Sequence, residues 1–261
     1  MPPRKLTNEN YFSAENTERY MGSSQYKAFT KCEAAAVSEI NGEYVREVSD
    51  SMLVGSYVDA WYEGTLTQFK IDHPELFTRS GDLKSQFKHA DYMIERASRD
   101  KLFSKYMSGK KQVIMKGRIA GVPYKIKIDS YHPDRAIVDL KCMRSLETIY
   151  SPELGCRQHF IDFWRYDIQG AIYREIVYQR TGKQLPFYIA AITTEKEPAL
   201  RVYWVPDSVL DAALSEVKLK SPRFQKIKKG RLKPERCGNC DYCRRTAVLT
   251  GVVNYLDELE L

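Results

Sequence analysis

The stretch Tyr124-Lys-Ile-Lys-Ile-Asp129-Ser-Tyr-His-Pro-Asp-Arg-Ala-Ile-Val-Asp139-Leu-Lys141 decides the fold class, because apolar and polar residues alternate on both sides of a turn. Alternation with a period of two is typical of β-strands, and the Pro-Asp pair between the two runs supplies turn chemistry. A turn centred near residue 134 places Asp129 roughly opposite Asp139. The same period puts Asp139 and Lys141 on one face of the second strand.

Two carboxylates that face each other across a sheet repel one another, so Asp129 and Asp139 require a compensating cation. A hard divalent ion such as Mg²⁺ or Mn²⁺ suits their oxygen ligands. Beside such an ion, Lys141 can orient an attacking water or stabilise a negatively charged transition state. Lys125 and Lys127 share the face of Asp129 and offer neutralisation without a metal, or contact with a phosphate backbone. The stretch therefore predicts a phosphodiester-cleaving site, and ordinary surface carboxylates are the alternative.

The order of elements predicts an α/β (α+β) fold in which helices flank a mixed sheet. Apolar periodicity predicts helices near 25–37, 51–62, 84–107, 159–180 and 207–228, and strands near 111–117, 123–131, 136–142, 186–193 and 201–205. Residues 1–20 are polar, so we expect them to be loosely held. The long connection over about 142–158 adjoins the proposed site, and we expect it to line a DNA channel.

Two helical pairs carry polar side chains four residues apart. Asp59 and Glu63 share a helix face and repel each other unless a cation lies nearby, so Asp59 is a candidate third metal ligand. The alternative is a solvated helix side. Gln169 and Tyr173 also share a face, and their amide and phenol can hydrogen-bond a phosphate or a water. Their spacing alone equally fits an ordinary helix surface.

Three cysteines near the carboxyl end form the run Cys237-Gly-Asn-Cys240-Asp-Tyr-Cys243. Thiols at this spacing can face one centre, and the run is similar to iron–sulfur ligation in bacterial ferredoxins. Zinc bound by the same thiolates is an alternative, and free reduced cysteines are another. The chain has six cysteines over 261 residues, which favours metal ligation or free thiols over a disulfide framework.

Charge and composition narrow the classes of function. The formal net charge is +7, which fits a polyanionic partner without requiring one. Nine positive side chains between Lys218 and Arg236 predict either a solvated helix face or a surface that follows a DNA backbone. No GxSxG elbow or GxxxxGK loop is present, which disfavours serine hydrolases and nucleotide-driven motors. The amino terminus has no apolar signal region and no window suits a membrane span, so we expect a cytoplasmic protein without membrane partners.

The motifs together resemble a known superfamily. Asp129 followed by Asp139-Leu140-Lys141 resembles the D…(D/E)-x-K signature of the PD-(D/E)XK nuclease superfamily. Gln169-Gly-Ala-Ile-Tyr173 resembles the Q-x-x-x-Y motif of its RecB-like and phage-recombination exonuclease branch (RecE/YqaJ-like). Gly55-Ser-Tyr-Val-Asp59 stands where that branch usually carries G-x-x-x-H, so an aspartate replaces the usual histidine. The matching motifs run from about residue 20 to residue 245.

The resemblance implies a restriction-endonuclease-like αβββαβ core in a single domain over residues 1–261. It also implies a Mg²⁺ or Mn²⁺ site that is held by Asp129, Asp139 and Asp59, with Lys141 beside them. In addition, Gln169 and Tyr173 would orient the strand that is cut.

The cysteine pattern of the same branch implies that Cys32 supplies a fourth thiolate to Cys237, Cys240 and Cys243. A 4Fe–4S cluster at these cysteines, or Zn²⁺ as the alternative, would act as a metal staple. It would join the N-terminal helix (about 23–37) to the C-terminal segment (about 230–250).

The expected function is that of a metal-dependent DNA exonuclease, which the resemblance places in phage-type recombination. It implies resection of duplex DNA ends and a single-strand annealing protein as partner. One alternative is a catalytically degenerate, metal-stapled DNA-binding module. Another is a structural or redox iron–sulfur protein that has no role with DNA.

Overall fold

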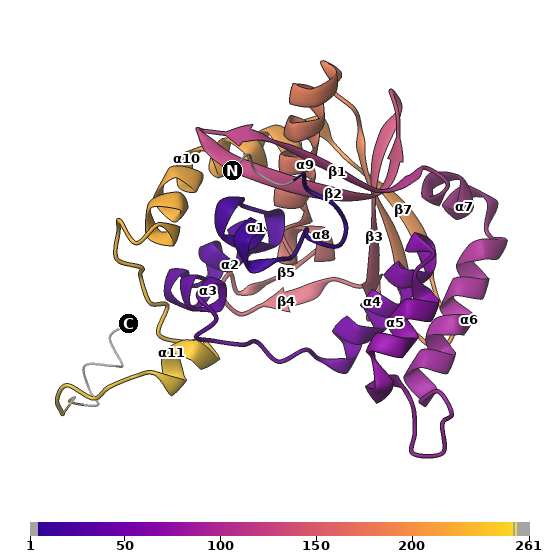
Figure 1. Cartoon of the computed structure of the whole chain (residues 1–261), viewed down its shortest axis with the longest axis horizontal. Coiled ribbons are helices and arrows are strands. Elements are labelled where there is room, and N and C mark those ends of the chain that lie inside the picture. The colour runs from indigo at the N-terminus through magenta and orange to yellow at the C-terminus, as the bar shows by residue number, and fades with distance from the viewer. Residues whose placement is uncertain (1–4, 253, 255–261) are drawn as a thin grey trace.

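A five-stranded mixed sheet forms the centre of the protein (Figure 1). The computed structural model describes residues 5–252 and 254. Only β3 and β6 are parallel among the neighbouring strands of this sheet, and the other pairs are antiparallel. In spatial order the strands are β1 (Lys110–Ile119), β2 (Val122–His132), β3 (Ala136–Met143), β6 (Phe187–Thr193) and β7 (Leu200–Val205). The predicted α/β class, with a mixed sheet flanked by helices, is confirmed.

Helices cover both faces of the sheet and bury two apolar clusters. One layer contains α2 (Ser23–Lys31), α3 (Glu33–Ile40), α9 (Tyr166–Thr181) and α10 (Asp207–Lys228). The other contains α4 (Asp50–Glu63), α6 (Ser85–Arg99) and α7 (Lys101–Met107). Ile137 of β3 belongs to the first cluster, whereas Val138 and Leu140 belong to the second. A central strand buried on both faces is apolar nearly throughout, so its polar residues need a specific reason.

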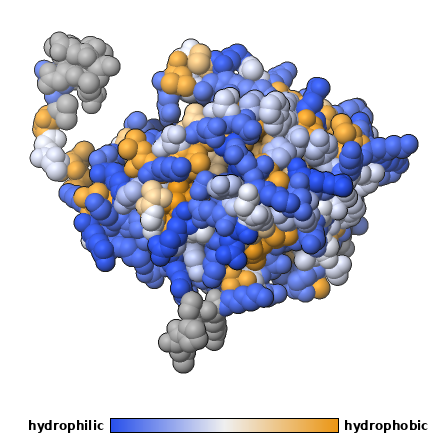
Figure 2. All heavy atoms as spheres, turned by 90° about the horizontal axis from the view of Figure 1, so that it is seen from above, coloured by the Kyte–Doolittle hydropathy of each residue, from blue (hydrophilic) through white to orange (hydrophobic). Residues whose placement is uncertain are grey.

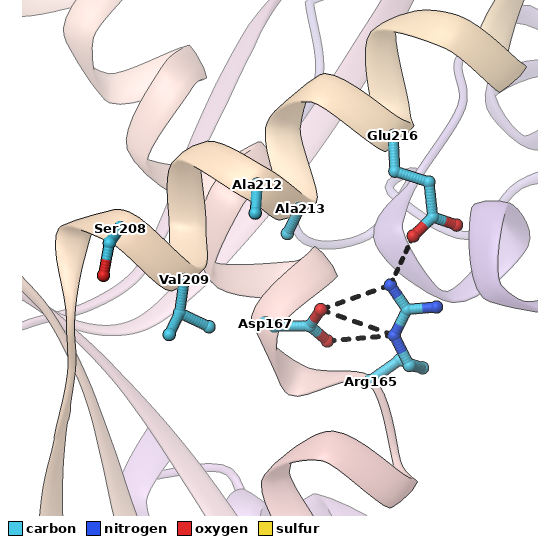
Figure 3. Close-up of a pocket in the computed structure, with 7 residues that line it drawn as sticks. All are labelled: Arg165, Asp167, Ser208, Val209, Ala212, Ala213 and Glu216. Atoms are coloured by element: carbon cyan, nitrogen blue, oxygen red, sulfur yellow. Dashed lines mark hydrogen bonds and ion pairs between the residues drawn. The ribbon is translucent and has the colours of Figure 1, made fainter. Parts of the chain in front are cut away.

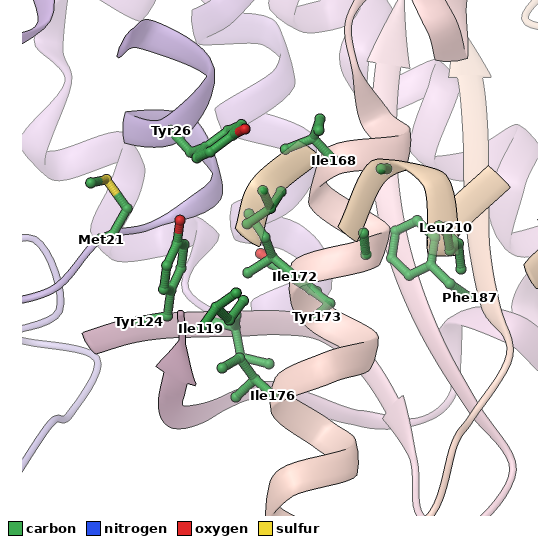
Figure 4. Packing of buried hydrophobic residues seen from close by; sticks show 14 of the residues in the cluster. Met21, Tyr26, Ile119, Tyr124, Ile168, Ile172, Tyr173, Ile176, Phe187 and Leu210 are labelled. Atoms are coloured by element: carbon green, nitrogen blue, oxygen red, sulfur yellow. The ribbon is translucent and has the colours of Figure 1, made fainter. Parts of the chain in front are cut away.

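Figure 4 shows how Ile168, Ile172 and Ile176 of α9 pack against the sheet beside Ile119 and Tyr124. Smaller elements connect the layers. The connections contain α1 (Ala14–Arg19), α5 (Leu66–Asp72), the 3-10 turn η1 (Pro74–Leu76), the hairpin β4 (Ile149–Ser151) and β5 (Cys156–Gln158), α8 (Phe160–Phe163) and α11 (Asp241–Arg245). The face seen in Figure 2 is mostly hydrophilic, with apolar groups in separate patches. Across residues 5–252 and 254, no helix has the length and apolar character needed to cross a bilayer.

Three predicted helices are each interrupted in the structure. Cys32 is extended (φ −162°, ψ 111°) and separates α2 from α3. Asp100 ends α6, and its side chain caps α7 by accepting the N–H of Phe103 at 2.9 Å. Arg165 has a left-handed backbone (φ 53°) and separates α8 from α9. The predictions of single helices over 25–37, 84–107 and 159–180 were therefore wrong, because apolar periodicity continues through a capped break.

The amino-terminal segment is held more firmly than its polar composition predicts. Residues 1–4 lie outside the described part, but Leu6, Tyr11 and Tyr20 are buried. The buried Lys125 ammonium donates to the carbonyl of Tyr11, and that of Lys228 donates to the carbonyl of Tyr20 at 2.7 Å. The expectation of a loosely held start was wrong for residues 5–20, because a small apolar cluster and two ammonium groups hold this segment.

Candidate active site

The two acidic residues of the hairpin lie where the pairing of β2 with β3 stops. The last pair of the ladder is Ser130 with Val138, so the register places Asp129 opposite Asp139. Instead of continuing the ladder, Asp129 Oδ2 accepts the backbone N–H of Leu140 at 2.8 Å. A side chain therefore takes the place of a backbone acceptor, and the two strands separate at the carboxylates.

Strand β1, which pairs with β2 on the side away from β3, is also distorted beside Asp129. Gln112 lies between the paired residues Lys111 and Val113 of β1, and has a left-handed backbone (φ 51°). Its Nε2 donates a long hydrogen bond of 3.5 Å to Asp129 Oδ1, and its buried Oε1 has no hydrogen-bond partner. Left-handed non-glycine residues are strained and concentrate at functional sites. This bend could not be predicted, because no glycine or proline marks position 112.

Asp139 is the most enclosed carboxylate of the site, with 2% of its surface exposed. Gln169 of α9 donates to its Oδ1 at 2.6 Å. Its buried Oδ2 accepts no hydrogen bond and forms an ion pair with the Lys141 ammonium. Burial alone would lower the pKa of Lys141, but Asp139 and Asp129 outweigh that effect and raise it. Lys141 is therefore a fixed positive charge in the site.

Helix α4 brings Asp59 to the same place. The helix passes over β3, where an added Cβ at Gly55 would lie 3.9 Å from that of Cys142. Burial raises the pKa of Asp59 to about 7; Lys141 opposes the rise, and Asp139 adds to it. Burial also raises the pKa of Asp129, and both Asp139 and Asp59 contribute. The three carboxylates therefore lie close enough to act on one another electrostatically.

The charges of this cluster fit a divalent cation. Among the ion pairs of residues 5–252 and 254, only that of Lys141 involves one of the three acids Asp59, Asp129 and Asp139, while nearby Glu63 pairs with Lys127. The carboxylate oxygens of these three residues are not all within 4.8 Å of one another. In residues 5–252 and 254, only the four cysteines form a potential metal-binding group as close as that. Mutual repulsion of the carboxylates accounts for their separation. Hard cations prefer carboxylate oxygens, and the site supplies three carboxylates of which only Asp139 is ion-paired among the described residues, so the chemistry of the ligands fits Mg²⁺ or Mn²⁺.

The two predicted polar residues of α9 contact the strands that carry the acids. Gln169 holds Asp139, as described above, and the Tyr173 hydroxyl donates to the carbonyl of Lys127 at 3.0 Å. Gly170 makes the close approach of this helix possible, because an added Cβ would lie 2.5 Å from Cδ1 of Phe187. Both side chains therefore hold β2 and β3 in place from the same face of α9.

Two further residues of the site were missed in the sequence. Lys27 of α2 lies with its Nζ 4.9 Å from the centre of the Tyr166 ring, and Lys141 Nζ lies 5.1 Å from the same centre. Burial lowers the pKa of Lys27 to about 8, and the neighbouring Lys141 contributes. Neither residue belongs to a motif, and only the packing of α2 against α9 brings them together.

Lys125 and Lys127, the proposed alternative neutralisers of Asp129, have other partners. Lys125 is buried against Tyr11, as described for the amino-terminal segment. Lys127 forms an ion pair of 3.6 Å with Glu63 and lies 5.4 Å from the ring centre of Phe12. Among the described residues, Asp129 forms no ion pair with either lysine, so neutralisation by these two groups is not supported.

The four predicted cysteines converge at a second centre, between α3 and α11 (Figure 1). Their sulfur atoms all lie within 4.8 Å of one another. Cys243 Sγ is 3.6 Å from Cys32 Sγ and 3.9 Å from Cys237 Sγ. Backbone N–H groups point at the sulfurs of Cys32, Cys237 and Cys240 at 3.4–3.5 Å. Such donors stabilise thiolates, so the quartet is prepared to bind a metal.

An ion-pair network fixes the two chain segments beside the cysteines. Arg223 of α10 binds both carboxylate oxygens of Glu33, at 2.7 and 2.9 Å, and also contacts Glu235 at 2.7 Å. Glu33 follows Cys32 directly, and Glu235 precedes Cys237 by two residues. The backbone N–H groups of Ala34 and Glu235 close the junction by bonding across it at 3.0 and 2.8 Å.

The basic run of α10 and the segment after it is only partly open to solvent. Arg223 holds the junction described above, and Lys228 is buried. Ion pairs or hydrogen bonds engage three further members of the run, namely Lys220, Lys229 and Arg236. Within the described ranges, the remaining members have no such partner: Lys218, Lys226, Arg231 and Lys233. Most of the run therefore has a structural role, which weakens the prediction of a continuous DNA-binding surface.

Comparisons with known proteins agree with this geometry. Residues 22–246 match the family described as "PDDEXK-like domain of unknown function (DUF3799)". The crystal structure of a "Putative exonuclease" from Eubacterium rectale is similar, with a TM-score of 0.93 and 46% sequence identity. The similarity covers 98% of each chain. A comparison with curated proteins gives no match.

Proposed function

The chain belongs to this PDDEXK-like family, and on that premise we propose that it is a metal-dependent DNA exonuclease. One observation carries the proposal: Asp59, Asp129, Asp139 and the Lys141 ammonium converge where the β2–β3 ladder opens. The similarity to a "Putative exonuclease" supports the reaction class.

Asp59, Asp129 and Asp139 are the residues that would hold one or two Mg²⁺ or Mn²⁺ ions. A divalent ion bound there supplies Lewis acidity to the scissile phosphate and lowers the pKa of a bound water. Lys141 orients the attacking water and offsets the negative charge that develops on the phosphate. Gln169 fixes the rotamer of Asp139 through its amide, and Tyr173 holds the middle of β2 through the carbonyl of Lys127.

The motifs of the recombination branch supply the finer assignment. We infer that the substrate is duplex DNA, resected from its ends, and that the single strands pass to an annealing protein during phage-type recombination. The Gln169–Tyr173 pair supports this branch, because both residues contact the strands that carry the acids. Asp59 departs from the histidine of the branch, but its carboxylate is also a ligand for hard cations.

We also propose that the cysteine centre is a metal staple within a single nuclease domain. It joins α2 and α3 to the segment over about 230–250. The cysteine motif favours a 4Fe–4S cluster, whereas the sulfur spacing favours zinc. Tetrahedral zinc with Zn–S bonds of about 2.3 Å places sulfurs about 3.8 Å apart. Visible absorption with iron and zinc analysis distinguishes the two: a coloured, iron-containing protein supports the cluster, and a colourless, zinc-containing protein supports the single ion.

Incubation with linear and closed circular duplex DNA tests the activity. We expect the wild type with Mg²⁺ to degrade the linear form and to leave circles intact. Asp139→Asn and Lys141→Ala should each lower the rate by at least about 100-fold, because each removes charge from the site. Asp134→Asn is the matched control, since Asp134 is an exposed turn residue that pairs with Lys183. Degradation of circles by the wild type would argue for an endonuclease instead.

The second candidate is a catalytically degenerate DNA-binding module with the same metal staple. The replacement of the usual histidine by Asp59 is the observation that favours it. Retained DNA binding without cleavage in Mg²⁺ or Mn²⁺ would support this candidate. A coloured protein that neither binds nor cleaves DNA would instead support the redox iron–sulfur alternative.

A further inference from the structure

Trp164 is an exposed aromatic residue beside the proposed catalytic cluster. It caps the end of α8, and 43% of its surface is exposed. Two residues later, the ring of Tyr166 contacts the Lys141 ammonium. An indole that is open to solvent and so near a phosphate-cleaving site has the properties of a platform for a nucleobase.

The backbone beside Trp164 is strained and firmly held. Arg165 has φ 53° and ψ 49°, a left-handed conformation that is costly for a residue with a side chain. Its guanidinium is held by Asp167 and, at 2.6 Å, by Glu216 of α10, where the three line a shallow cavity (Figure 3). This turn directs Tyr166 towards Lys141 and leaves Trp164 at the surface. Strain maintained by ion pairs to another helix indicates that the orientation of this turn matters.

Two lysines of α2 flank the indole. Lys27 Nζ donates to the Trp164 carbonyl at 3.3 Å, and Lys31 Nζ lies 5.5 Å from the centre of the indole ring. Neither ammonium forms an ion pair with a carboxylate within residues 5–252 and 254. An exposed indole with one ammonium over its ring and a second at its backbone carbonyl, neither of them paired with a carboxylate in the described residues, matches the base and the phosphates of one nucleotide.

We propose that Trp164, Lys27 and Lys31 form a subsite for an unpaired nucleotide next to the scissile phosphate. The indole stacks on the base, and the two ammonium groups contact the flanking phosphates. The inference rests on the proposed nuclease function, and it assigns the site a contact with an unpaired nucleotide at the end of the duplex. Stacking tolerates every base, so the subsite adds affinity without sequence specificity. Trp164 is a binding residue here, and Arg165 is a positioning residue.

Binding of a short single-stranded oligonucleotide tests the subsite, with an abasic oligomer of equal length as the comparison ligand. Affinities are measured without added Mg²⁺, so that no hydrolysis is needed for the readout. Trp164→Ala should weaken binding of the intact oligonucleotide about tenfold and that of the abasic oligomer less than about twofold. Trp164→Phe should retain most of the affinity and lose the fluorescence quenching that binding causes in the wild type.

Trp204→Ala is the matched control, because Trp204 is also exposed but lies on β7 at the sheet edge. It should leave affinity and quenching unchanged. Equal losses for intact and abasic oligomers in Trp164→Ala, or no loss at all, would overturn the subsite while leaving cleavage intact. Selective quenching in a wild type that cleaves no DNA would overturn the nuclease and retain the subsite. If Trp164→Ala does not fold, the wild type and Trp164→Phe on the two oligomers decide.

Discussion

The ionisation of Asp59 makes the stability of the folded, metal-free protein depend on pH. Burial raises its folded pKa to about 7, above the roughly 3.9 of an unfolded aspartate. The folded state therefore binds the proton more tightly, and metal-free stability falls as pH rises from about 4 to 7. Asp59→Asn removes this penalty. We expect its advantage over the wild type to grow by on the order of 2 kcal/mol between pH 5 and pH 8.

Urea unfolding without divalent ions measures this advantage, with exposed Asp134→Asn as the control. Mg²⁺ should then stabilise the wild type more than Asp59→Asn at pH 8, because the ion takes the place of the proton. An advantage that does not change with pH would contradict the assignment of Asp59 as a buried, ionisable member of the cluster.

The individual residues of the site were predictable to different degrees. Asp129, Asp139 and Lys141 were recognisable because turn chemistry and a period of two fix their register and face. The role of Gln112 was not predictable, because nothing in the residues of β1 indicates a left-handed backbone at this position. Lys27 was not either, because its contact with Tyr166 depends on how α2 packs against a helix that lies far away in the sequence.

The close packing of α9 on the sheet predicts opposite effects for two glycine substitutions. At Gly170, an added Cβ would lie 2.5 Å from Phe187 Cδ1 and 2.8 Å from Leu210 Cδ2. Gly170→Ala should cost about 1–3 kcal/mol through overpacking, despite the better helix propensity of alanine. Gly55→Ala of α4 is the control, because its Cβ would meet only Cys142 at 3.9 Å. It should stabilise by about 0.5–1 kcal/mol.

Thermal or urea unfolding of the two variants provides the measurement. Destabilisation by Gly55→Ala would show that α4 approaches β3 more closely than this structure indicates. An alanine at position 55 would meet Cys142 only at ordinary van der Waals distance. A stable Gly170→Ala variant would mean that α9 can shift, and it should then lose the Gln169 contact with Asp139.

The clamp between α10 and the cysteine segments predicts an effect on metal retention. Arg223→Ala removes the bidentate contact with Glu33 and the contact with Glu235, so the segments that carry Cys32 and Cys237 lose their orientation. We expect about tenfold weaker metal binding, measured as faster release to a chelator. Lys226→Ala, an exposed residue of the same helix, should release metal at the wild-type rate. Equal release by both variants would show that the cysteines orient themselves.

Elements were predicted well where they are long and regular, and poorly where a cap intervenes. The three central strands and α10 are at the expected positions, because their patterns are uninterrupted. The break at Cys32 was missed, although it explains the role of this residue. Extended backbone at Cys32 turns its sulfur towards the N–H of Ala35 and the other thiols, which a continuous helix would prevent.

For the molecule as a whole, the cysteine centre should decide how firmly the two ends of the chain hold together. Cys32 and Cys243 lie 211 residues apart in sequence, so a metal between them removes much chain entropy from the unfolded state. Removal of the metal, or Cys240→Ser, should lower the free energy of unfolding by about 3–5 kcal/mol. Cys156→Ser is the control, since this exposed cysteine of β5 lies outside the quartet.

Chemical unfolding and limited proteolysis check this expectation. Cleavage in the metal-free protein should begin in α2, α3 or residues 230–250, while the sheet stays resistant. The overall architecture was predictable because it follows from the order of elements, and the convergence of Cys237, Cys240 and Cys243 because their spacing is specific. The docking of residues 5–20 was not predictable, because this segment has a polar composition and two buried lysines hold it in place.

The wide separation of the four cysteines in the sequence also limits when they can bind a metal together during synthesis of the chain. Cys32 leaves the ribosome long before Cys243, and translation at roughly 5–20 residues per second separates them by roughly 10–40 seconds. During that interval the first thiol has none of its three partners, so oxidants and wrong metals have access to it. Metal binding by all four cysteines therefore has to wait for the last of them, and a nascent chain halted before Cys237 would lack the three thiols that converge on Cys32.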